Sequence, residues 1–183
     1  MVSQRSPAAD RNAPALSICI PTYNRMEMIV ELVRALTAVG GNFEILVHDD
    51  GSTDDTLKAL SSIGDPRLHV TSGPNRGRAH ALASATAGAA GFFTMLFDDD
   101  DELWPDGLGL VLADCAEPLP DGAAGYIYHM ADEAGVRIGD AFPAGRSNFL
   151  ALRAHRSQQP APELHPLGIA ERNSGLHHRG RCD

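Results

Sequence analysis

Four consecutive aspartates, Asp98–Asp101, directly follow an apolar run and form the chemically most distinctive segment of the sequence. Adjacent carboxylates repel one another unless a cation neutralises them. Hard divalent ions such as Mg²⁺ and Mn²⁺ prefer oxygen ligands and share them with substrate phosphates. The run therefore indicates a divalent-cation site. The alternative is an exposed acidic turn in which Asp100 or Asp101 caps the next helix.

A second acidic segment, Asp49-Asp50-Gly51-Ser52, follows another apolar run. A carboxylate in this position can accept hydrogen bonds from a nucleobase N–H group or a ribose hydroxyl. Gly51 permits a tight turn. The alternative is ordinary turn chemistry, in which Ser52 caps the helix that follows.

Two basic or aromatic segments complete the set of candidate site residues. In Pro21–Arg25, Tyr23 could stack on a base that Thr22 binds, or Thr22 or Asn24 could simply cap a helix. In Asn75–Arg78, the arginines at a helix start suit a phosphate, or they are merely solvated. His80, one turn further on, is interpreted as a surface or packing residue.

The elements that must position these residues alternate between strands and helices. Strands are predicted at 16–20, 43–47, 68–71, 92–97 and 124–130 from their apolar runs. Helices are predicted at 25–39, from Ser52 or Thr53 to Ile63, at 76–90 and from Pro105 onward. This alternation predicts an α/β fold with a parallel sheet. Because the polar segments follow the strands, they should converge at the carboxyl edge of that sheet.

Composition limits the classes of function. The 183 residues are 43% hydrophobic and carry a net charge of −9, which excludes non-specific nucleic-acid binding through a basic surface. No apolar run is long enough for a transmembrane segment. The three cysteines are odd in number and include no CxxC pair, which favours a reducing compartment. We therefore expect a location in the cytoplasm, the inner face of a membrane included. Residues 1–14 are expected to be a disordered tail, 15–153 the folded domain, and 154–183 a poorly ordered tail.

The four polar segments occur in the order and spacing of a known family. The sequence resembles family 2 glycosyltransferases from Leu16 to about Leu108, through Ser17–Arg25, Glu44–Asp54, Asn75–Gly77 and Leu96–Pro105. The resemblance implies a GT-A fold, a Rossmann-like and mostly parallel sheet with helices on both faces. It also implies inverting transfer of a sugar from a nucleoside-diphosphate sugar to an acceptor hydroxyl, with Mn²⁺ or Mg²⁺.

The resemblance assigns roles by motif. Asp98-x-Asp100 matches the family's DxD motif, in which the first Asp contacts the ribose or metal and the last binds the metal. Asp101 shares that role if the register shifts by one, and Arg78 would contact the diphosphate. The residues implied in nucleotide binding are Pro21, Thr22, Tyr23, Asp49, Asp50, Arg78 and Asp98.

The sequence departs from the family pattern in two places. Ala81–Ala85 stands where the family usually carries an Ala-Arg-Asn-type sequence. No segment matches the region that bears the general base, for which Asp132, Glu133 and Asp140 are conceivable substitutes. Truncation or a frame shift past about residue 154 would explain both the missing base and the tail composition. The alternative function is therefore a non-catalytic nucleotide-sugar-binding fragment, and the acceptor is unspecified.

Overall fold

The computed structural model describes residues 13–101, 105–117, 126 and 128. The chain divides into two compact units, residues 1–118 and 119–183. Described residues of the first unit form strands β1 (Leu16–Thr22), β2 (Phe43–Asp49), β3 (Leu68–Ser72) and β4 (Phe93–Leu96). Its helices are α1 (Met26–Ala38), α2 (Thr56–Ser61), α3 (Arg78–Ala87) and α4 (Pro105–Ala116). In the second unit, the described residues Tyr126 and Tyr128 belong to no strand.

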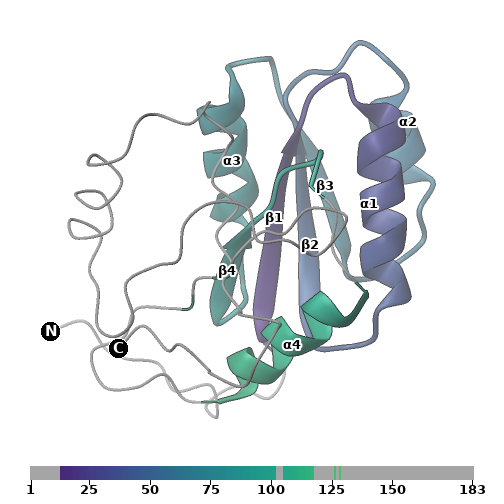
Figure 1. The fold of residues 1–183 in the computed structure, drawn as a ribbon. Coiled ribbons are helices and arrows are strands. Elements are labelled where there is room, and N and C mark those ends of the chain that lie inside the picture. The colour runs from purple at the N-terminus through teal and green to yellow at the C-terminus, as the bar shows by residue number, and fades with distance from the viewer. Residues whose placement is uncertain (1–12, 102–104, 118–125, 127, 129–183) are drawn as a thin grey trace, which may run out of the picture. The chain divides into compact units, whose positions relative to one another are not determined.

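The four strands form one parallel sheet in the order β3-β2-β1-β4 (Figure 1). The chain builds outward from β1 to β3 and then returns to place β4 on the other side of β1. The order of strands therefore reverses between β1 and β4. In open α/β sheets, ligands bind outside the carboxyl ends of the strands at such a switch point.

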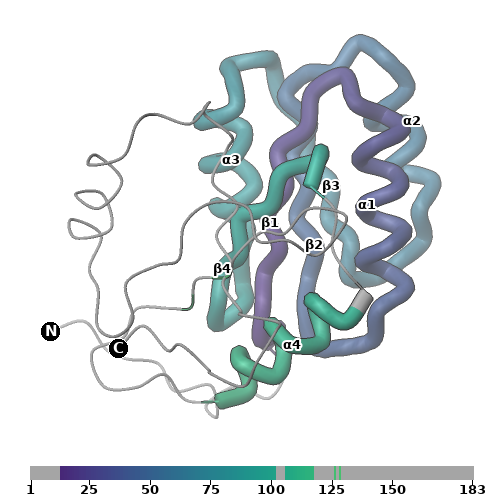
Figure 2. The backbone as a smooth tube through the Cα atoms, viewed as in Figure 1, coloured from purple at the N-terminus to yellow at the C-terminus, as the bar shows by residue number. Residues whose placement is uncertain are grey.

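Helices lie on both sides of the two central strands. Every residue of β1 and β2 is buried, so both faces of these strands are covered. Cys19 and Leu46 pack with Ala85 of α3 on one face. The tube in Figure 2 shows α1 and α2 on the other side of the strands from α3. The parallel α/β sheet predicted from the alternation and the Rossmann-like fold implied by the resemblance are both confirmed.

The predicted element types are confirmed for the four described strands and the four helices, and two of the suggested helix caps are absent. Neither Ser52 nor Thr53 caps the second helix, which begins at Thr56 with Asp55 at the N-cap position and no side-chain cap bond. Ser52 and Thr53 instead bond to the loop after β1 through Asn24. Tertiary hydrogen bonds between two loops therefore replace the local cap.

The alternative interpretation of the first loop, a helix cap by Thr22 or Asn24, is also not what the structure has. Arg25 holds the N-cap position of α1 and makes no side-chain cap bond. The predicted strand at 124–130, apart from the two tyrosines, lies outside the described residues, as do residues 1–12 and the predicted tail at 154–183. No helix within the described part of the chain is both long and apolar enough to cross a membrane.

Candidate active site

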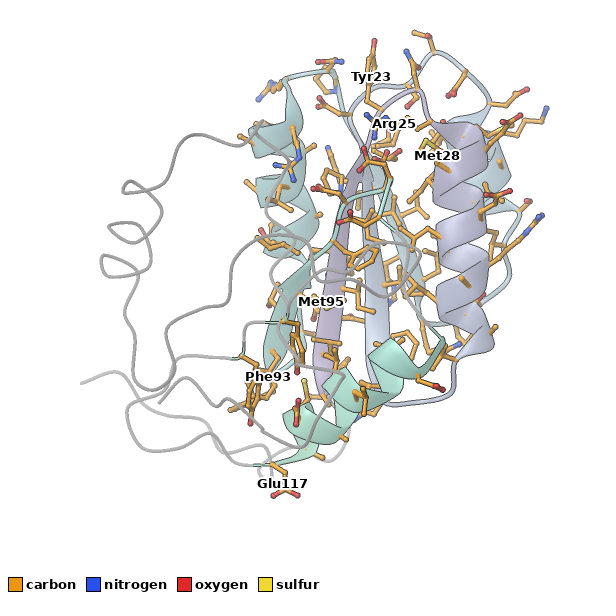
Figure 3. All side chains as sticks on the ribbon, viewed as in Figure 1. Tyr23, Arg25, Met28, Phe93, Met95 and Glu117 are labelled. Atoms are coloured by element: carbon orange, nitrogen blue, oxygen red, sulfur yellow. The ribbon has the colours of Figure 1, made fainter. Side chains whose placement is uncertain are left out.

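The loops that follow β1 and β4 are joined across the switch point by side-chain contacts. The Thr22 hydroxyl donates to Oδ2 of Asp99 at 2.7 Å. The Arg25 guanidinium lies 2.8 Å from Oδ1 of Asp99 and 2.8 Å from Oδ2 of Asp100. Figure 3 shows Arg25 and Tyr23 at the end of the sheet opposite to Phe93. The acidic run is therefore held against the first loop, as the topology predicts.

Asp98 is held from the other side of the sheet. Arg78, the first residue of α3, forms an ion pair with Oδ1 of Asp98. The second carboxylate oxygen, Oδ2, is buried and has no hydrogen-bond partner. A buried carboxylate oxygen without a partner is costly, and a bound cation or donor would relieve that cost.

The electrostatics of the acidic run favour a cation. Burial, together with the charges of Asp98 and Asp100, raises the pKa of Asp101 to about 6. Burial also raises the pKa of Asp99, against the opposing hydrogen bond from Thr22 and the charge of Arg25. A divalent cation would stabilise the ionised carboxylates and satisfy the orphaned oxygen of Asp98. The chemistry of this donor set therefore fits the metal that the resemblance implies.

Asp50 organises the third loop at this edge. The side chain is buried, and its two carboxylate oxygens accept backbone N–H groups of Arg76 at 2.9 Å and Gly77 at 2.8 Å. The loop after β2 and the loop that leads into α3 are thereby tied together. Asp50 thus lies beside the N-terminus of α3, where Arg78 reaches Asp98.

The Asp49 carboxylate accepts hydrogen bonds from the turn after β2 and from β3. Its carboxylate accepts the backbone N–H of Ser52 at 3.2 Å and the Ser72 hydroxyl at 2.9 Å. These contacts close the turn after β2 and connect it to β3. They match the turn chemistry that the sequence left open, and the predicted contact of Asp49 with a nucleotide stays a prediction.

Pro21 and Tyr23, at the end of β1 and in the loop after it, differ in exposure. Pro21 is buried in β1 beside His48 of β2. The side chain of Tyr23 is 43% exposed, so its ring is accessible at the carboxyl edge. Asn24 follows in the left-handed region, with a φ of 52°, and its Oδ1 accepts the Thr53 N–H at 2.7 Å.

Comparison with known proteins identifies the family of this site. Residues 17–161 match the profile of "Glycosyl transferase family 2". The chain belongs to this family. The match covers all four predicted polar segments and both loops that meet at the switch point, so the family is the glycosyltransferase family expected from the sequence.

Relatives and solved structures of glycosyltransferases agree with the assignment. The chondroitin synthase of Pasteurella multocida (strain Pm70) is 36% identical over 118 residues, which are 63% of this chain and 12% of that protein. The mannosyltransferase PcManGT of Pyrobaculum calidifontis, solved with GDP-Man and Mn²⁺, is 30% identical with a TM-score of 0.50, covering 58% of this chain and 33% of that one.

A second solved structure shows a related fold. The S. aureus TarS 1–349 structure in complex with UDP is 31% identical with a TM-score of 0.50, covering 54% of this chain and 31% of that one. This chain therefore spans a third or less of the length of these proteins.

In this member of glycosyltransferase family 2, two contributors to the site were not assigned a role from the sequence. Asp99 binds both Thr22 and Arg25, although the DxD pattern draws attention to its neighbours. Arg25 belonged to a recognised segment, but only folding reveals that it pairs with the acidic run. The one available signal was charge complementarity between a loop with one arginine and a loop with four aspartates.

Proposed function

We propose that this chain binds a nucleoside-diphosphate sugar at the carboxyl edge of the sheet and transfers the sugar, with inversion, to an acceptor hydroxyl, assisted by Mn²⁺ or Mg²⁺. The observation that carries the proposal is the meeting of the loops after β1 and β4 with Arg78 of α3 at the switch point. The solved relatives in complex with GDP-Man and Mn²⁺ and with UDP support it.

The nucleoside would bind between the first and second loops. The accessible Tyr23 ring offers a stacking surface for a base, which is sequence-tolerant because every base has a π face. Asp50 offers carboxylate lone pairs to a base N–H group or a ribose hydroxyl, and two backbone N–H groups fix its orientation. Thr22, Pro21 and Asp49 support this subsite from the strand ends.

The diphosphate would bind between the acidic run and α3. Asp98, Asp100 and Asp101 would hold the cation, and Arg78 would exchange Asp98 for a diphosphate oxygen. A bound divalent cation supplies Lewis-acid stabilisation of the negative charge on the leaving nucleoside diphosphate. Arg25, bonded to both Asp99 and Asp100, keeps the acidic run in position before the donor arrives.

The transfer step requires a proton acceptor. The acceptor oxygen forms a bond to the anomeric carbon while the bond from that carbon to the diphosphate oxygen breaks, and a carboxylate base takes the hydroxyl proton. The candidates Asp132, Glu133 and Asp140 lie outside the described residues. Substitution of these three carboxylates, with nucleotide release as the readout, would identify the base.

A second candidate function is nucleotide-sugar binding without transfer. The observation that favours it is that the described side-chain contacts at the switch point join only the loops of the proposed donor site. Binding needs only the loops described above. Transfer also needs a base and an acceptor subsite.

The test measures binding and turnover separately. The chain is incubated with Mn²⁺ and a panel of UDP-, GDP- and TDP-sugars, and thermal shift and nucleotide release are recorded. A donor at about 100 times its Kd stabilises the folded state by roughly 2.7 kcal/mol, so Tm should rise by several degrees. Asp100→Ala and Asp98→Asn should abolish the Mn²⁺-dependent shift, because each removes a proposed cation ligand.

Asp55→Asn is the matched control, since Asp55 is exposed and pairs only with Lys58 among the described contacts. It should bind donor as the parent does. A Tm shift without nucleotide release for any acceptor would favour the binding-only function. The absence of any Mn²⁺-dependent nucleotide binding, with Asp100→Ala indistinguishable from the parent, contradicts both functions.

A further inference from the structure

A second group of metal-ligating side chains shares Asp50 with the proposed nucleotide subsite. His48 is near the end of β2, Asp50 follows the strand, and His80 lies in the first turn of α3. One ligand atom from each lies within 4.8 Å of the other two, and this is the one such His, Cys, Asp and Glu group within the described residues. The group contains nitrogen donors, unlike the oxygen-only run Asp98–Asp101.

One ring nitrogen of His48 already has a polar partner. Its Nδ1 lies 2.9 Å from the Thr71 hydroxyl oxygen, and that hydroxyl points to the carbonyl of Val47 at 3.4 Å. If the hydroxyl proton is directed to the carbonyl, Nδ1 carries the hydrogen and donates it to Thr71. The lone pair then remains on Nε2, and a hydrogen bond from the other ring nitrogen is the usual way in which proteins orient a ligating histidine.

The Nε2 atom of His48 lacks any partner of its own. His48 is only 6% exposed, and Nε2 is buried with no hydrogen bond. Native proteins leave few buried polar atoms unpaired, because each costs the full loss of its hydration. Burial lowers the pKa of His48, and the charge of Asp50 opposes that shift.

We infer that His48, Asp50 and His80 bind one transition-metal ion of the Zn²⁺ class. Two imidazoles and one carboxylate form a three-ligand zinc set that leaves a fourth position open. Ligand atoms about 2.0–2.1 Å from zinc in a tetrahedron are roughly 3.4 Å apart, so the group must contract on binding. His80 is the most accessible member, and its contacts to Arg76 and Ser84 are both long, at 3.4 Å, so its ring can make that movement.

Such an ion would join β2 to α3 directly. Asp50 already bonds to the backbone of Arg76 and Gly77, the two residues that precede α3. Coordination by His80 would add a bond from the helix itself. Zinc and the proposed donor would compete for Asp50, so zinc binding is measured without nucleotide.

The test uses the full chain after removal of metals with a chelator. Zn²⁺ binding is measured by calorimetry, and Co²⁺ is added as a spectroscopic probe whose visible absorption reports tetrahedral nitrogen and oxygen coordination. His80→Gln should weaken Zn²⁺ binding by at least about 100-fold, since loss of outer-shell partners alone typically costs 10–100-fold. His48→Gln should do the same, and Thr71→Val should weaken binding by about 10–100-fold through the ring of His48.

His69→Gln is the matched control, because His69 is an exposed histidine on β3 outside the group. It should bind Zn²⁺ as the parent does. Four further histidines follow residue 154, and the His48→Gln/His80→Gln double variant measures their background. Equal affinity, stoichiometry and Co²⁺ spectrum in His80→Gln and the parent would overturn the proposal. In Asp100→Ala, which should lose Mn²⁺-dependent donor binding, the His80-dependent Zn²⁺ site should persist, so the two proposals fail independently.

Discussion

At the scale of single residues, Gly51 connects backbone conformation to the candidate site most directly. Its φ of +77° lies in the left-handed region, which residues with a Cβ rarely adopt. A Cβ atom there would lie 2.8 Å from the backbone nitrogen of Asn75 and 2.9 Å from the carbonyl oxygen of Gly73. The loop after β2 can therefore approach the loop before α3 only because position 51 has no side chain.

Gly51→Ala is expected to destabilise the protein by about 1–3 kcal/mol and to weaken donor binding, because the loop that carries Asp50 must shift. Chemical denaturation and nucleotide titration measure the two effects. Gly64→Ala is the control, since a Cβ there meets nothing within 4 Å. Unchanged stability and affinity in Gly51→Ala would show that the close approach is not needed.

At the scale of elements, Arg67 links the end of α1 to the start of β3. Its guanidinium donates to the carbonyl oxygens of Val39 and Thr37, each at 2.7 Å, and to the carboxylate of Asp65. The same group lies 4.6 Å from the ring centroid of Phe43 in β2. The carbonyls at a helix C-terminus lack partners within the helix, and this arginine supplies them.

Asp65→Asn is expected to lower stability by about 1 kcal/mol at neutral pH, because Asp65 holds Arg67 in a partly exposed ion pair. Hydrogen bonds from Arg67 lower the pKa of Asp65 below its ordinary value of 3.8. The stabilisation is therefore present above the unfolded-state pKa and is lost as the pH falls through the lower folded-state pKa.

Denaturant unfolding from pH 7 to pH 2 measures this difference between parent and variant. The gap should be constant above about pH 5 and close at lower pH. Asp55→Asn provides the comparison, because Asp55 and its partner Lys58 are both strongly exposed. A gap that persists unchanged at pH 2 would show that the charge of Asp65 does not act through Arg67.

At the scale of the whole molecule, the two ends of the sheet hold different kinds of buried carboxylate. Oε1 of Glu44 accepts the Ser17 hydroxyl at 2.5 Å, the Ala90 N–H at 2.7 Å and the Gly91 N–H at 3.2 Å. Glu44 lies in β2 near the amino ends of the strands, away from the acidic run. Its oxygen is satisfied, whereas Oδ2 of Asp98 at the other end has no partner. The first carboxylate stabilises the fold, and the second is available for a ligand.

Glu44→Ala should therefore lower stability by about 1–3 kcal/mol, because the buried Ser17 hydroxyl and the Ala90 N–H lose their acceptor, while donor affinity of the folded protein stays unchanged. Asp98→Asn should leave stability nearly unchanged and abolish Mn²⁺-dependent donor binding. Glu44→Gln keeps an acceptor oxygen and should recover part of the stability. Calorimetric unfolding and nucleotide titration on the same samples separate the effects, and a loss of affinity in Glu44→Ala at a temperature where it is folded would contradict this division.

The sequence by itself determined the order of strands and helices and the positions of the polar segments. Apolar runs and helical periodicity depend on local residue pattern, so Leu16, Phe43 and Leu68 begin strands as predicted. Because parallel strands place their carboxyl ends on one edge, the convergence of the segments containing Thr22, Asp50 and Asp98 was also predictable. The acidic run could be recognised from its composition alone, although the sequence allowed either a divalent-cation site or an exposed acidic turn.

Only the tertiary structure decided which partner each polar side chain takes. Ser52 bonds to Asn24 instead of capping α2, and Asp49 turns to Ser72, because loops from different strands compete with the local backbone for the same donors. The meeting of His48 and His80 depends on α3 packing against β2, 32 positions apart in the sequence. Contacts between distant segments leave no periodic pattern in the sequence. The clustering of aspartates was therefore visible in the sequence, whereas their arginine and threonine partners and the unpaired oxygen of Asp98 were not.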